Sequence, residues 1–160
     1  MAIDKVRSYF RTYGMESEIL EFPVSSATVE LAAAALGCEP CRIAKSLSFK
    51  LDGSPILIVA AGDARIDNKK YREQFGAKAV MLHGEEVEQL TGHAIGGVCP
   101  FALPENVKVY LDVSLQRFET VFPAAGSSNS AIELTCAELE KYASNFVAWV
   151  DVCKGWRDEE

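Results

Sequence analysis

Residues 41–63 predict two β-strands joined by a tight turn: apolar residues alternate with small or polar ones in the first, and the second is a continuous apolar run. The Asp-Gly dipeptide between the two runs is typical of a two-residue hairpin. In the first strand Ile43, Leu47 and Phe49 recur at an even spacing, so their side chains share one face. Lys45 falls on that same face, where an apolar core residue would be expected.

Apolar residues at helical spacing, often followed by a glycine, mark further elements along the chain. Thr135 and Glu138 match the capping box that opens many helices. The predicted helices lie at 4–13, within 25–37, and at 67–75, 84–92 and 136–143. Further strands are predicted at 17–22, 78–82, 107–112, 120–126, 130–135 and 146–152, followed by a charged tail that is expected to fray.

Strands outnumber helices and are joined by short turns as often as by helices. That order favours an α+β (mixed α/β) fold with a substantial mixed sheet over an alternating, doubly wound one. A chain of 160 residues suits a single domain, which we assign to residues 1–160. No repeat or linker interrupts it.

The composition excludes several classes of protein. No apolar run approaches the roughly 20 residues that cross a bilayer, and the N-terminus is amphipathic rather than a signal peptide, so a cytoplasmic protein without a membrane partner is expected. The net charge of −7 argues against broad coating of nucleic acid. Residues 41–78 nevertheless hold eight Lys and Arg against four acids, which suits either a solvated helix face or contact with one end of a nucleic acid.

Cysteine and histidine spacing gives no sign of a metal site. Cys38 and Cys41 form a C-x-x-C pair, but a second pair is missing, and His83 and His93 are not spaced to complete one. We therefore predict no metal and no cofactor. Cys99 lies six residues after His93, and a thiol nucleophile activated by this histidine remains an alternative.

Three further stretches are candidate site segments. The "GGVCP" loop at 96–100 combines paired glycines with proline, so it is either a tight surface turn or a rigid loop whose backbone approaches a ligand. The small-residue stretch 124–134 is either a hairpin turn or the wall of a pocket. Asp63 follows a strand and is either a turn residue or an acceptor for a substrate amine. The Lys45 ammonium group either reaches water or lies at the edge of a pocket, where it faces an anion or an atom that gains negative charge during a reaction.

These segments together resemble a known family. The stretches "RIAKSL", "ILIVAAGDARIDNKK", "GHAIGGVCPFAL" and "AAGSSNSAIELT" have the order and spacing of the YbaK/EbsC family, which is related to the editing insertion of bacterial prolyl-tRNA synthetases. The similarity runs from about residue 17 to 152. It implies a single domain with a mixed, partly barrel-like sheet flanked by helices, and a freestanding deacylase that cleaves the ester of misacylated tRNA.

The resemblance also implies which residues form the site. The family lysine matches Lys45, the expected catalytic residue, and the family G-x-x-x-P loop matches residues 96–100. The expected substrate-binding residues are Ser46, Asp63, Gly96, Gly97, Val98, Cys99, Pro100, Gly126 and Ser127. The partner is the acceptor end of tRNA, with tRNA-Pro carrying a small non-cognate amino acid as the expected substrate and a synthetase as a further candidate partner.

The implied reaction is hydrolysis of an aminoacyl ester, which is already activated and therefore needs only modest catalysis. Backbone N–H groups of residues 96–99 would stabilise the oxyanion, and Lys45 would hold a phosphate or ribose oxygen or polarise the carbonyl. Water would be activated by the substrate itself. Two positions leave specificity open: Ser46 replaces the asparagine of the alanine-specific type, and the turn at 126–129 lacks a basic residue. A binding module of the same fold without turnover is the alternative.

Overall fold

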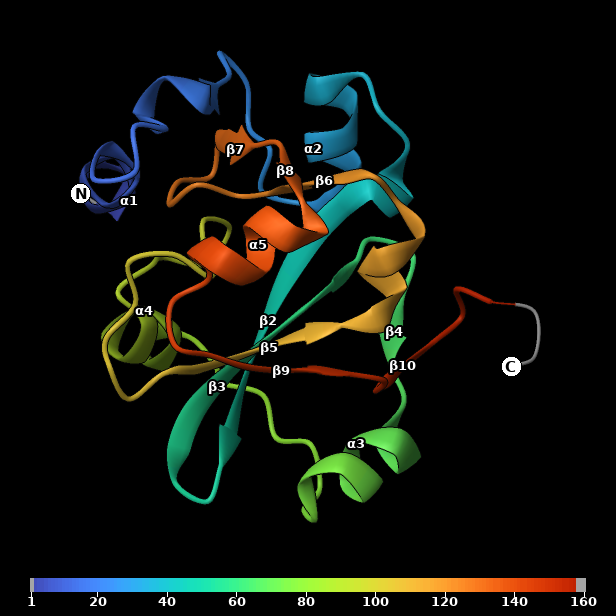
Figure 1. Ribbon diagram of the computed structural model, residues 1–160. Helices are drawn as coiled ribbons and strands as arrows, with labels where there is room; N and C mark the ends of the chain where they lie inside the picture. The colour runs from blue at the N-terminus through green and yellow to red at the C-terminus, as the bar shows by residue number, and fades with distance from the viewer. Residues whose placement is uncertain (1, 158–160) are drawn as a thin grey trace.

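One curled sheet organises the molecule, with the strand order β8-β6-β2-β3-β5-β9 (Figure 1). The computed structural model describes residues 2–157. Parallel and antiparallel neighbours both occur in the sheet, which curls into a half-barrel. The predicted mixed α/β, partly barrel-like class is therefore confirmed. Within residues 2–157, no helix combines the length and apolar character needed to cross a membrane.

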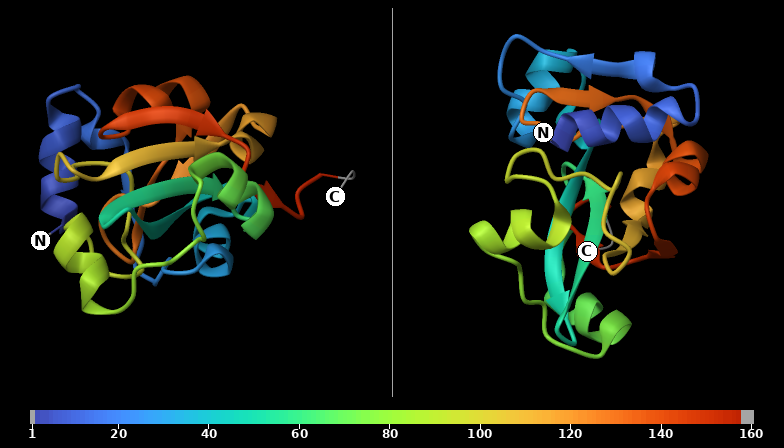
Figure 2. Two further views of the ribbon diagram at one scale, coloured as in Figure 1. Left: turned by 90° about the horizontal axis from the view of Figure 1, so that it is seen from below. Right: turned by 90° about the vertical axis from the view of Figure 1, so that its left-hand side faces the viewer.

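The helices and strands alternate irregularly along the chain. The helices are α1 Ala2–Arg11, α2 Val29–Leu36, α3 Asn68–Phe75, α4 Glu85–Thr91 and α5 Cys136–Tyr142. The strands are β1 Ile19–Glu21, β2 Ile43–Leu51, β3 Ser54–Ala61, β4 Arg65–Ile66, β5 Lys108–Asp112, β6 Thr120–Pro123, β7 Ser130–Ile132, β8 Leu134–Thr135, β9 Phe146–Val150 and β10 Cys153–Lys154. Figure 2 shows α1 and β7 close together at one end of the sheet and α3 at the other.

The predicted hairpin forms the centre of the sheet. β2 and β3 pair antiparallel along their whole length, and Leu51 lies opposite Ser54. Asp52 and Gly53 make the turn with φ angles of 51° and 80°. Positive φ at both central residues is what a type I′ turn requires, so the Asp-Gly dipeptide fixes the register of the pair.

The apolar face of β2 is covered at both ends by helices. Ile43 packs in a cluster with Ala32 of α2. Near the hairpin, Phe49 packs on Tyr71 of α3, with ring centroids 5.2 Å apart. Lys45 lies on the strand between these two contacts, and its ammonium group reaches the Gly62 carbonyl at 3.4 Å.

Helix boundaries follow the predicted signals closely. The Thr28 side chain accepts a hydrogen bond from the Leu31 N–H at the start of α2, and Gly37 ends this helix with φ 69°. Asp67 caps α3. The capping box of Thr135 and Glu138 is present at α5 and confirms that prediction.

Two strand predictions need correction beside the hairpin and near the N-terminus. The segment 78–82 forms a single bridge, between Met81 and Phe49, rather than a strand. It runs beside only the last part of β2 before the chain turns into α4. The predicted strand 17–22 is shorter, since its first residues form the 3-10 turn Glu16–Glu18.

The C-terminal predictions also change. The strand expected over 146–152 ends at Val150, because the Val152 N–H is taken by the Asp112 carboxylate at 2.9 Å. The first residues of the tail, which were expected to fray, instead form β10, which pairs antiparallel with β4; residues 158–160 lie outside the described part of the chain. The predicted strand 130–135 is broken at Glu133 into β7 and β8, which pair with different partners, and 120–126 ends as a strand at Pro123.

Candidate functional site

An interruption along the edge of β2 creates the cavity of interest. β6 pairs with β2 only at Ile43 and Ala44. Beyond the interruption, the segment 80–82 resumes the pairing, with the Leu82 N–H bonded to the Ser48 carbonyl at 3.1 Å. Between these partners the strand borders a cavity of about 290 Å³. Its volume lies at the lower end of the range for small-molecule sites.

Segments far apart in the sequence build the cavity walls. β2 forms one wall, the N-terminus of α2 a second, and the loop before the "GGVCP" proline a third. Val87 of α4 and residues of β6 and β7 complete it. The lining residues are Ser26, Ala27, Thr28, Val29, Ala32, Ile43, Ala44, Lys45, Ser46, Leu47, Ser48, Met81, Leu82, Val87, Ile95, Gly96, Val98, Phe122, Ala124, Ser130 and Ala131.

Lys45 is the one ionisable side chain among the described residues that line the cavity. Its Nζ donates a hydrogen bond to the Gly62 carbonyl at 3.4 Å, a long contact that leaves two N–H directions for a ligand. Burial lowers the pKa of this ammonium, an effect that the charges of Asp63 and Glu30 oppose. A partly desolvated cation at the edge of an apolar cavity is suited to an anionic or carbonyl oxygen.

Ser46 follows Lys45 and also lines the cavity. Its Oγ is buried and has no hydrogen-bond partner within residues 2–157. A buried hydroxyl without a partner is uncommon, because its desolvation is not compensated. This hydroxyl is therefore a candidate hydrogen-bond partner for a ligand in the cavity.

The predicted glycine loop is split between the cavity and the core. Gly96 and Val98 line the cavity, whereas Gly97 faces away from it. A Cβ on Gly97 would lie 2.9 Å from the backbone N and Cα of Ser127, so the two loops touch backbone to backbone. The Gly97 N–H is bonded to the Ala94 carbonyl at 2.9 Å, so it is not one of the oxyanion donors expected from the loop.

Cys99 and Pro100 lie behind the cavity rather than in its lining. The Cys99 thiol is fully buried, and burial raises its pKa to about 12. Its Sγ lies 3.5 Å from the His93 Nε2. A thiol that is neutral and closed off from the cavity is not poised for nucleophilic attack, and the geometry disfavours the thiol alternative.

The predicted turn residues Gly126 and Ser127 support the cavity from outside. A Cβ on Gly126 would meet the backbone of Ala2 at 3.0 Å, so this turn packs on α1. The Ser127 hydroxyl donates to the Ser130 Oγ at 2.7 Å, and Ser130 does line the cavity. The turn is also tied to another wall, since the Ser26 N–H donates to the Ser128 carbonyl at 2.6 Å.

Asp63 is not brought to the cavity. Its carboxylate accepts two hydrogen bonds from the Arg117 guanidinium, at 2.6 and 3.0 Å. Arg117 is also stacked on Trp156, with the guanidinium carbon 5.1 Å from the ring centroid. Asp63 therefore joins β3 to the C-terminal segment, and a substrate amine would have to compete with a bidentate partner.

Three hydroxyl-bearing residues of the lining were not predicted as site residues: Ser26, Thr28 and Ser48. Ser26 and Thr28 precede α2, where serine and threonine are ordinary turn and cap residues, and Ser48 lies on β2. Ser130 falls in the stretch 124–134, for which a pocket wall was one of two predictions. For Thr28 the one available signal was its position as the N-cap of a helix, because a helix N-terminus offers free backbone N–H groups to a ligand. No group of three or more metal-ligating side chains occurs in the described part of the chain.

Comparison with known proteins agrees with this geometry. The family model described as an aminoacyl-tRNA editing domain matches residues 24–142. The chain belongs to the aminoacyl-tRNA editing domain family. The matched residues include every segment that lines the cavity, and the predicted resemblance is confirmed.

The relatives include two proteins that the chain matches over most of their length and a ligase that it matches over a fifth of its length. The chain is 58% identical to YwhH of Bacillus subtilis (strain 168) over 98% of its own length and 99% of that protein, to whose name no activity is attached. It is 32% identical, over 67% of its length and 66% of that chain, to EbsC of Enterococcus faecalis, provisionally named a Cys-tRNA(Pro)/Cys-tRNA(Cys) deacylase. It matches 20% of the proline–tRNA ligase of Lysinibacillus sphaericus at 33% identity.

The fold has a solved counterpart of the same length. The crystal structure of a proposed trans-editing enzyme for prolyl-tRNA synthetase superposes with a TM-score of 0.83. The two chains are 30% identical, and the match covers 96% of this chain and 98% of the other. The chain thus shares its architecture with that structure over nearly its whole length.

Proposed function

We propose that this protein hydrolyses the ester bond of a misacylated tRNA, with tRNA-Pro carrying a small non-cognate amino acid as the substrate. The support is a family assignment together with a cavity that fits the reaction. The cavity is small, mostly apolar, lined by hydroxyls, and has a single cation at its edge.

The observation that carries the proposal is the position of Lys45. It is the residue that matches the family lysine, and it lies partly desolvated between two apolar contacts of the same strand. Its ammonium would hold a phosphate or ribose oxygen of the terminal nucleotide, or polarise the ester carbonyl. In water-poor surroundings either interaction is stronger than in bulk solvent.

Hydrolysis itself would require little from the protein. Water adds to the ester carbon, the carbonyl oxygen becomes an oxyanion, and the bond to the ribose oxygen breaks. That oxygen takes a proton, and the amino acid leaves as a carboxylate. The backbone N–H groups of Gly96 and Val98 are the candidate oxyanion donors, because these residues line the cavity. No carboxylate, imidazole or thiol is among its described lining residues, so the substrate itself would activate the water.

The size of the cavity would select the amino acid. The lining alternates small residues such as Ala124 and Ala131 with Ile43 and Phe122, which leaves room for a small side chain. A bulkier cognate residue would be excluded sterically, which is how an editing site separates two amino acids that differ by size. The unpartnered Ser46 hydroxyl would favour a side chain or amine that can form a hydrogen bond.

The tRNA would approach from the C-terminal end of β3, where Ala60 pairs with Lys45 of β2. Gly62, which accepts the Lys45 hydrogen bond, is three residues from Arg65, whose charge also lowers the pKa of Lys45. Arg65 stands directly opposite Lys154 in the β4–β10 pair. Like charges across a strand pair are unfavourable unless an anion lies between or above them, and a phosphate would relieve this repulsion.

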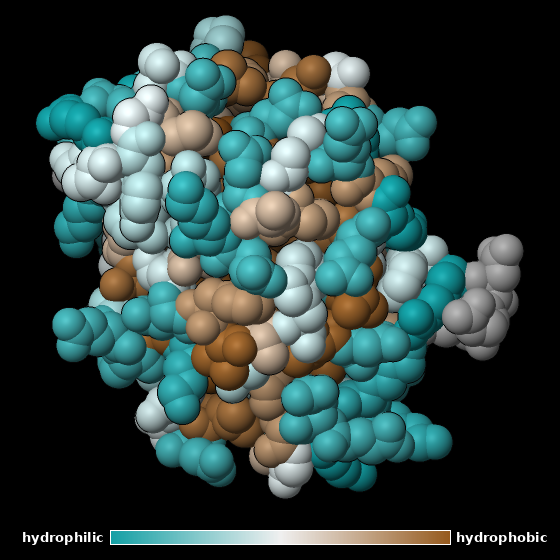
Figure 3. All heavy atoms as spheres, in the orientation of Figure 1, coloured by the Kyte–Doolittle hydropathy of each residue, from teal (hydrophilic) through white to brown (hydrophobic). Residues whose placement is uncertain are grey.

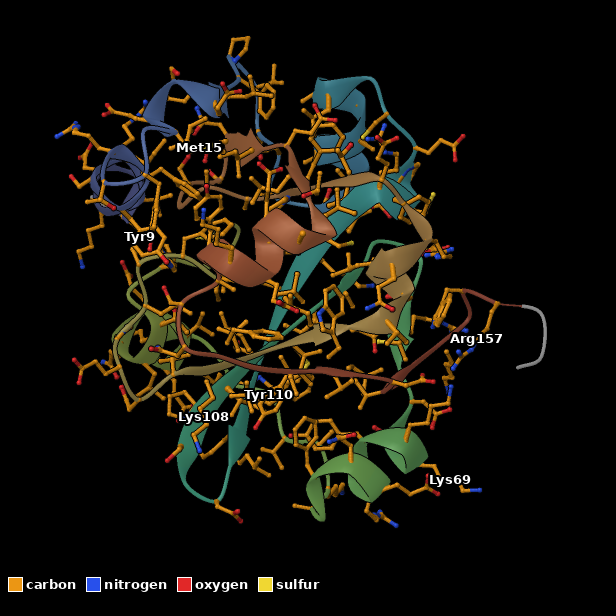
Figure 4. The ribbon with its side chains drawn as sticks, in the orientation of Figure 1. Tyr9, Met15, Lys69, Lys108, Tyr110 and Arg157 are labelled. Atoms are coloured by element: carbon orange, nitrogen blue, oxygen red, sulfur yellow. The ribbon has the colours of Figure 1, made fainter. Side chains whose placement is uncertain are left out.

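Beyond β4 the chain continues into a polar and partly basic surface at α3. Figure 3 shows hydrophilic residues gathered over α3, at the lower right. Figure 4 shows Lys69 projecting outward from α3, with Arg157 on the same side of the molecule. This side offers a few phosphate contacts, in keeping with the basic segment 41–78, while the chain as a whole carries −7.

The test is a panel of mischarged tRNAs. Purified protein is incubated with tRNA-Pro and with a second tRNA, each carrying alanine, serine, cysteine, threonine or proline, and the remaining ester is measured over time. Faster loss of one small non-cognate amino acid, with Pro-tRNA-Pro spared, supports the proposal. Loss at the buffer rate for every member contradicts it.

A binding module without turnover is the second candidate. The absence of a carboxylate, imidazole or thiol from the described cavity lining is what favours it. Such a module would bind mischarged tRNA and protect its ester. The same panel separates the two functions, because the ester would then disappear more slowly than in buffer.

A further inference from the structure

The loop of residues 93–101, which carries Gly96, is bridged at its base by the side chain of His93, its first residue. The His93 Nε2 lies 2.9 Å from the Phe101 carbonyl oxygen, and both residues are fully buried. A carbonyl can only accept, so the ring nitrogen that faces it must carry the proton. The imidazole is therefore the Nε2–H tautomer, and it spans the loop from residue 93 to residue 101.

Both ends of this loop are anchored independently of the cavity. The His93 N–H donates to the Thr91 Oγ1 at 3.1 Å, and this hydroxyl donates to the Val87 carbonyl at 2.6 Å. At the far end, the Pro100 carbonyl accepts the Ser144 N–H at 2.7 Å, and the Phe101 ring packs edge-on against Phe10. The imidazole thus joins two fixed points.

The residues between these points face the proposed reaction centre. Ile95, Gly96 and Val98 line the cavity. The separation of the loop ends determines where this backbone lies, because only a few residues connect them. The His93–Phe101 hydrogen bond spans that separation directly, in addition to the anchors at each end.

Neither His93 nor Cys99 fits a catalytic role. Neither residue is in the cavity lining. Burial lowers the pKa of the imidazole and raises that of the thiol, so both are neutral at neutral pH. Lys5 of α1 is the charged group whose field reaches the ring, and it too favours the neutral form.

We propose that His93 is a positioning residue for ester hydrolysis: its neutral imidazole is a hydrogen-bonded strut that holds residues 95–98 against the cavity. This inference rests on the proposed function for the reaction, and on the His93–Phe101 geometry for the strut. Cys99 gives the strut a readout that does not depend on activity. Its Sγ lies beneath the loop, 3.8 Å from the same Phe101 carbonyl, and becomes reactive only if the loop opens.

The experiment compares three substitutions. His93→Phe fills a similar volume without a donor. His93→Gln keeps an Nε2–H at about the distance that reaches the carbonyl. His83→Phe is the matched control, because His83 is the second histidine of the chain and is exposed. Melting temperature, kcat and KM on the best substrate of the tRNA panel, and the rate of Cys99 alkylation mapped by peptide mass spectrometry, are measured for each.

A strut predicts a split among these readouts. His93→Phe should lower kcat by about 10- to 100-fold, the scale expected for a displacement of about 1 Å, while KM changes little. It should also speed Cys99 alkylation several-fold. In His93→Gln both kcat and the alkylation rate should return most of the way to the wild-type values, and His83→Phe should match the wild type. If His93→Phe does not fold, His93→Asn takes its place, because its shorter amide does not reach the carbonyl.

Other outcomes would overturn the inference. Wild-type kcat and wild-type alkylation in His93→Phe would show that the hydrogen bond positions nothing. Equal defects in the Phe and Gln variants would show that the ring shape matters rather than the donor. If the wild type hydrolyses no member of the panel, the proposed function and the catalytic role of His93 both fail, and alkylation alone then decides whether the strut exists.

Discussion

Gly97 and Ser127 touch through their backbones, although thirty residues separate them in the chain. A Cβ placed on Gly97 would lie 2.9 Å from both the Cα and the N of Ser127, closer than real Cβ contacts come. The cavity loop and the turn before β7 therefore form one unit. Each loop carries lining residues, Gly96 on one and Ser130 on the other.

Gly97→Ala should separate these two loops. The added methyl meets backbone, which cannot rotate away, so we expect the free energy of unfolding to fall by about 1–3 kcal/mol. The candidate oxyanion donors would move with the loop, and kcat/KM for the edited tRNA should fall at least about tenfold. Urea unfolding and deacylation are measured on the same preparation. Ser128→Ala, in the same turn, adds no atom and should resemble the wild type. Unchanged kcat/KM in Gly97→Ala would mean that the loop does not contribute to the site.

The His93 imidazole makes stability depend on pH. Burial lowers its pKa in the folded chain below the ordinary 6.5, and a proton added at Nδ1 would find no acceptor within residues 2–157. The unfolded chain therefore binds this proton more tightly. The stability tied to the neutral ring is fully present above about pH 6.5 and is lost as pH falls through the lower, folded pKa. His93→Gln should lose less stability between pH 7.5 and 5 than the wild type does.

Urea unfolding at several pH values measures this effect. His83→Gln is the control, since His83 is exposed and should leave the wild-type curve unchanged. Parallel pH curves for the wild type and His93→Gln would contradict the assignment of a lowered pKa to His93.

Cys99→Ser should change the rate only modestly. The thiol is buried, neutral at ordinary pH and outside the cavity lining, so its replacement should cost about tenfold in kcat or less, roughly 1.4 kcal/mol of barrier. Single-turnover deacylation gives the rate, and acid quenching followed by intact-mass measurement searches for an acyl-thioester. A trapped thioester on the wild type, with complete loss of activity in Cys99→Ser, would restore the thiol mechanism.

Binding of tRNA should be weak and moderately salt-sensitive. Two to four phosphate contacts predict a slope of log K against log salt near −1.5 to −3, at about −0.7 for each contact on single-stranded RNA. Reversing the charges of Lys69 and Lys70 should flatten the slope. Lys70 also donates to the Cys153 carbonyl at 3.0 Å, so the double reversal Arg65→Glu with Lys154→Glu is the cleaner variant.

Lys108→Glu is the matched control for this titration. Lys108 pairs with Ile56 near the hairpin end of β3, about 20 Å along the strand from Gly62. The titration uses acceptor-stem RNA that carries no amino acid, so that binding is measured separately from hydrolysis. A slope of about −6 or steeper would require a larger RNA footprint, and an unchanged slope in the double variant would place the RNA on another face.

Local signals were sufficient for much of the fold and for singling out Lys45, which lines the cavity. The Asp-Gly turn, the glycine that ends α3 and the capping box of α5 depend on neighbours in sequence, and each appears as predicted. Lys45 could be identified because a charge interrupts an alternating apolar face. That signal is a conflict between local pattern and burial, which is often where function lies.

Long-range relationships account for what the sequence could not show. The open edge of β2 exists because β6 stops at Pro123 and the segment 80–82 pairs too late, and neither end is visible in a local pattern. The two-residue strands β4 and β10 are too short to have a period. Asp63 finds a partner in Arg117, 54 residues away, and this contact removes it from the cavity.

The central claim is that Lys45 acts on the ester of a misacylated tRNA. The most direct measurement is single-turnover deacylation of the preferred mischarged tRNA-Pro by the wild type, Lys45→Ala and Lys50→Ala. Lys50 is the matched control, since it lies on the same strand but pairs with Glu86 at 2.7 Å and is outside the cavity lining. We expect Lys45→Ala to lose activity while it melts at the wild-type temperature, and Lys50→Ala to retain activity. Hydrolysis by Lys45→Ala at the wild-type rate would contradict the account.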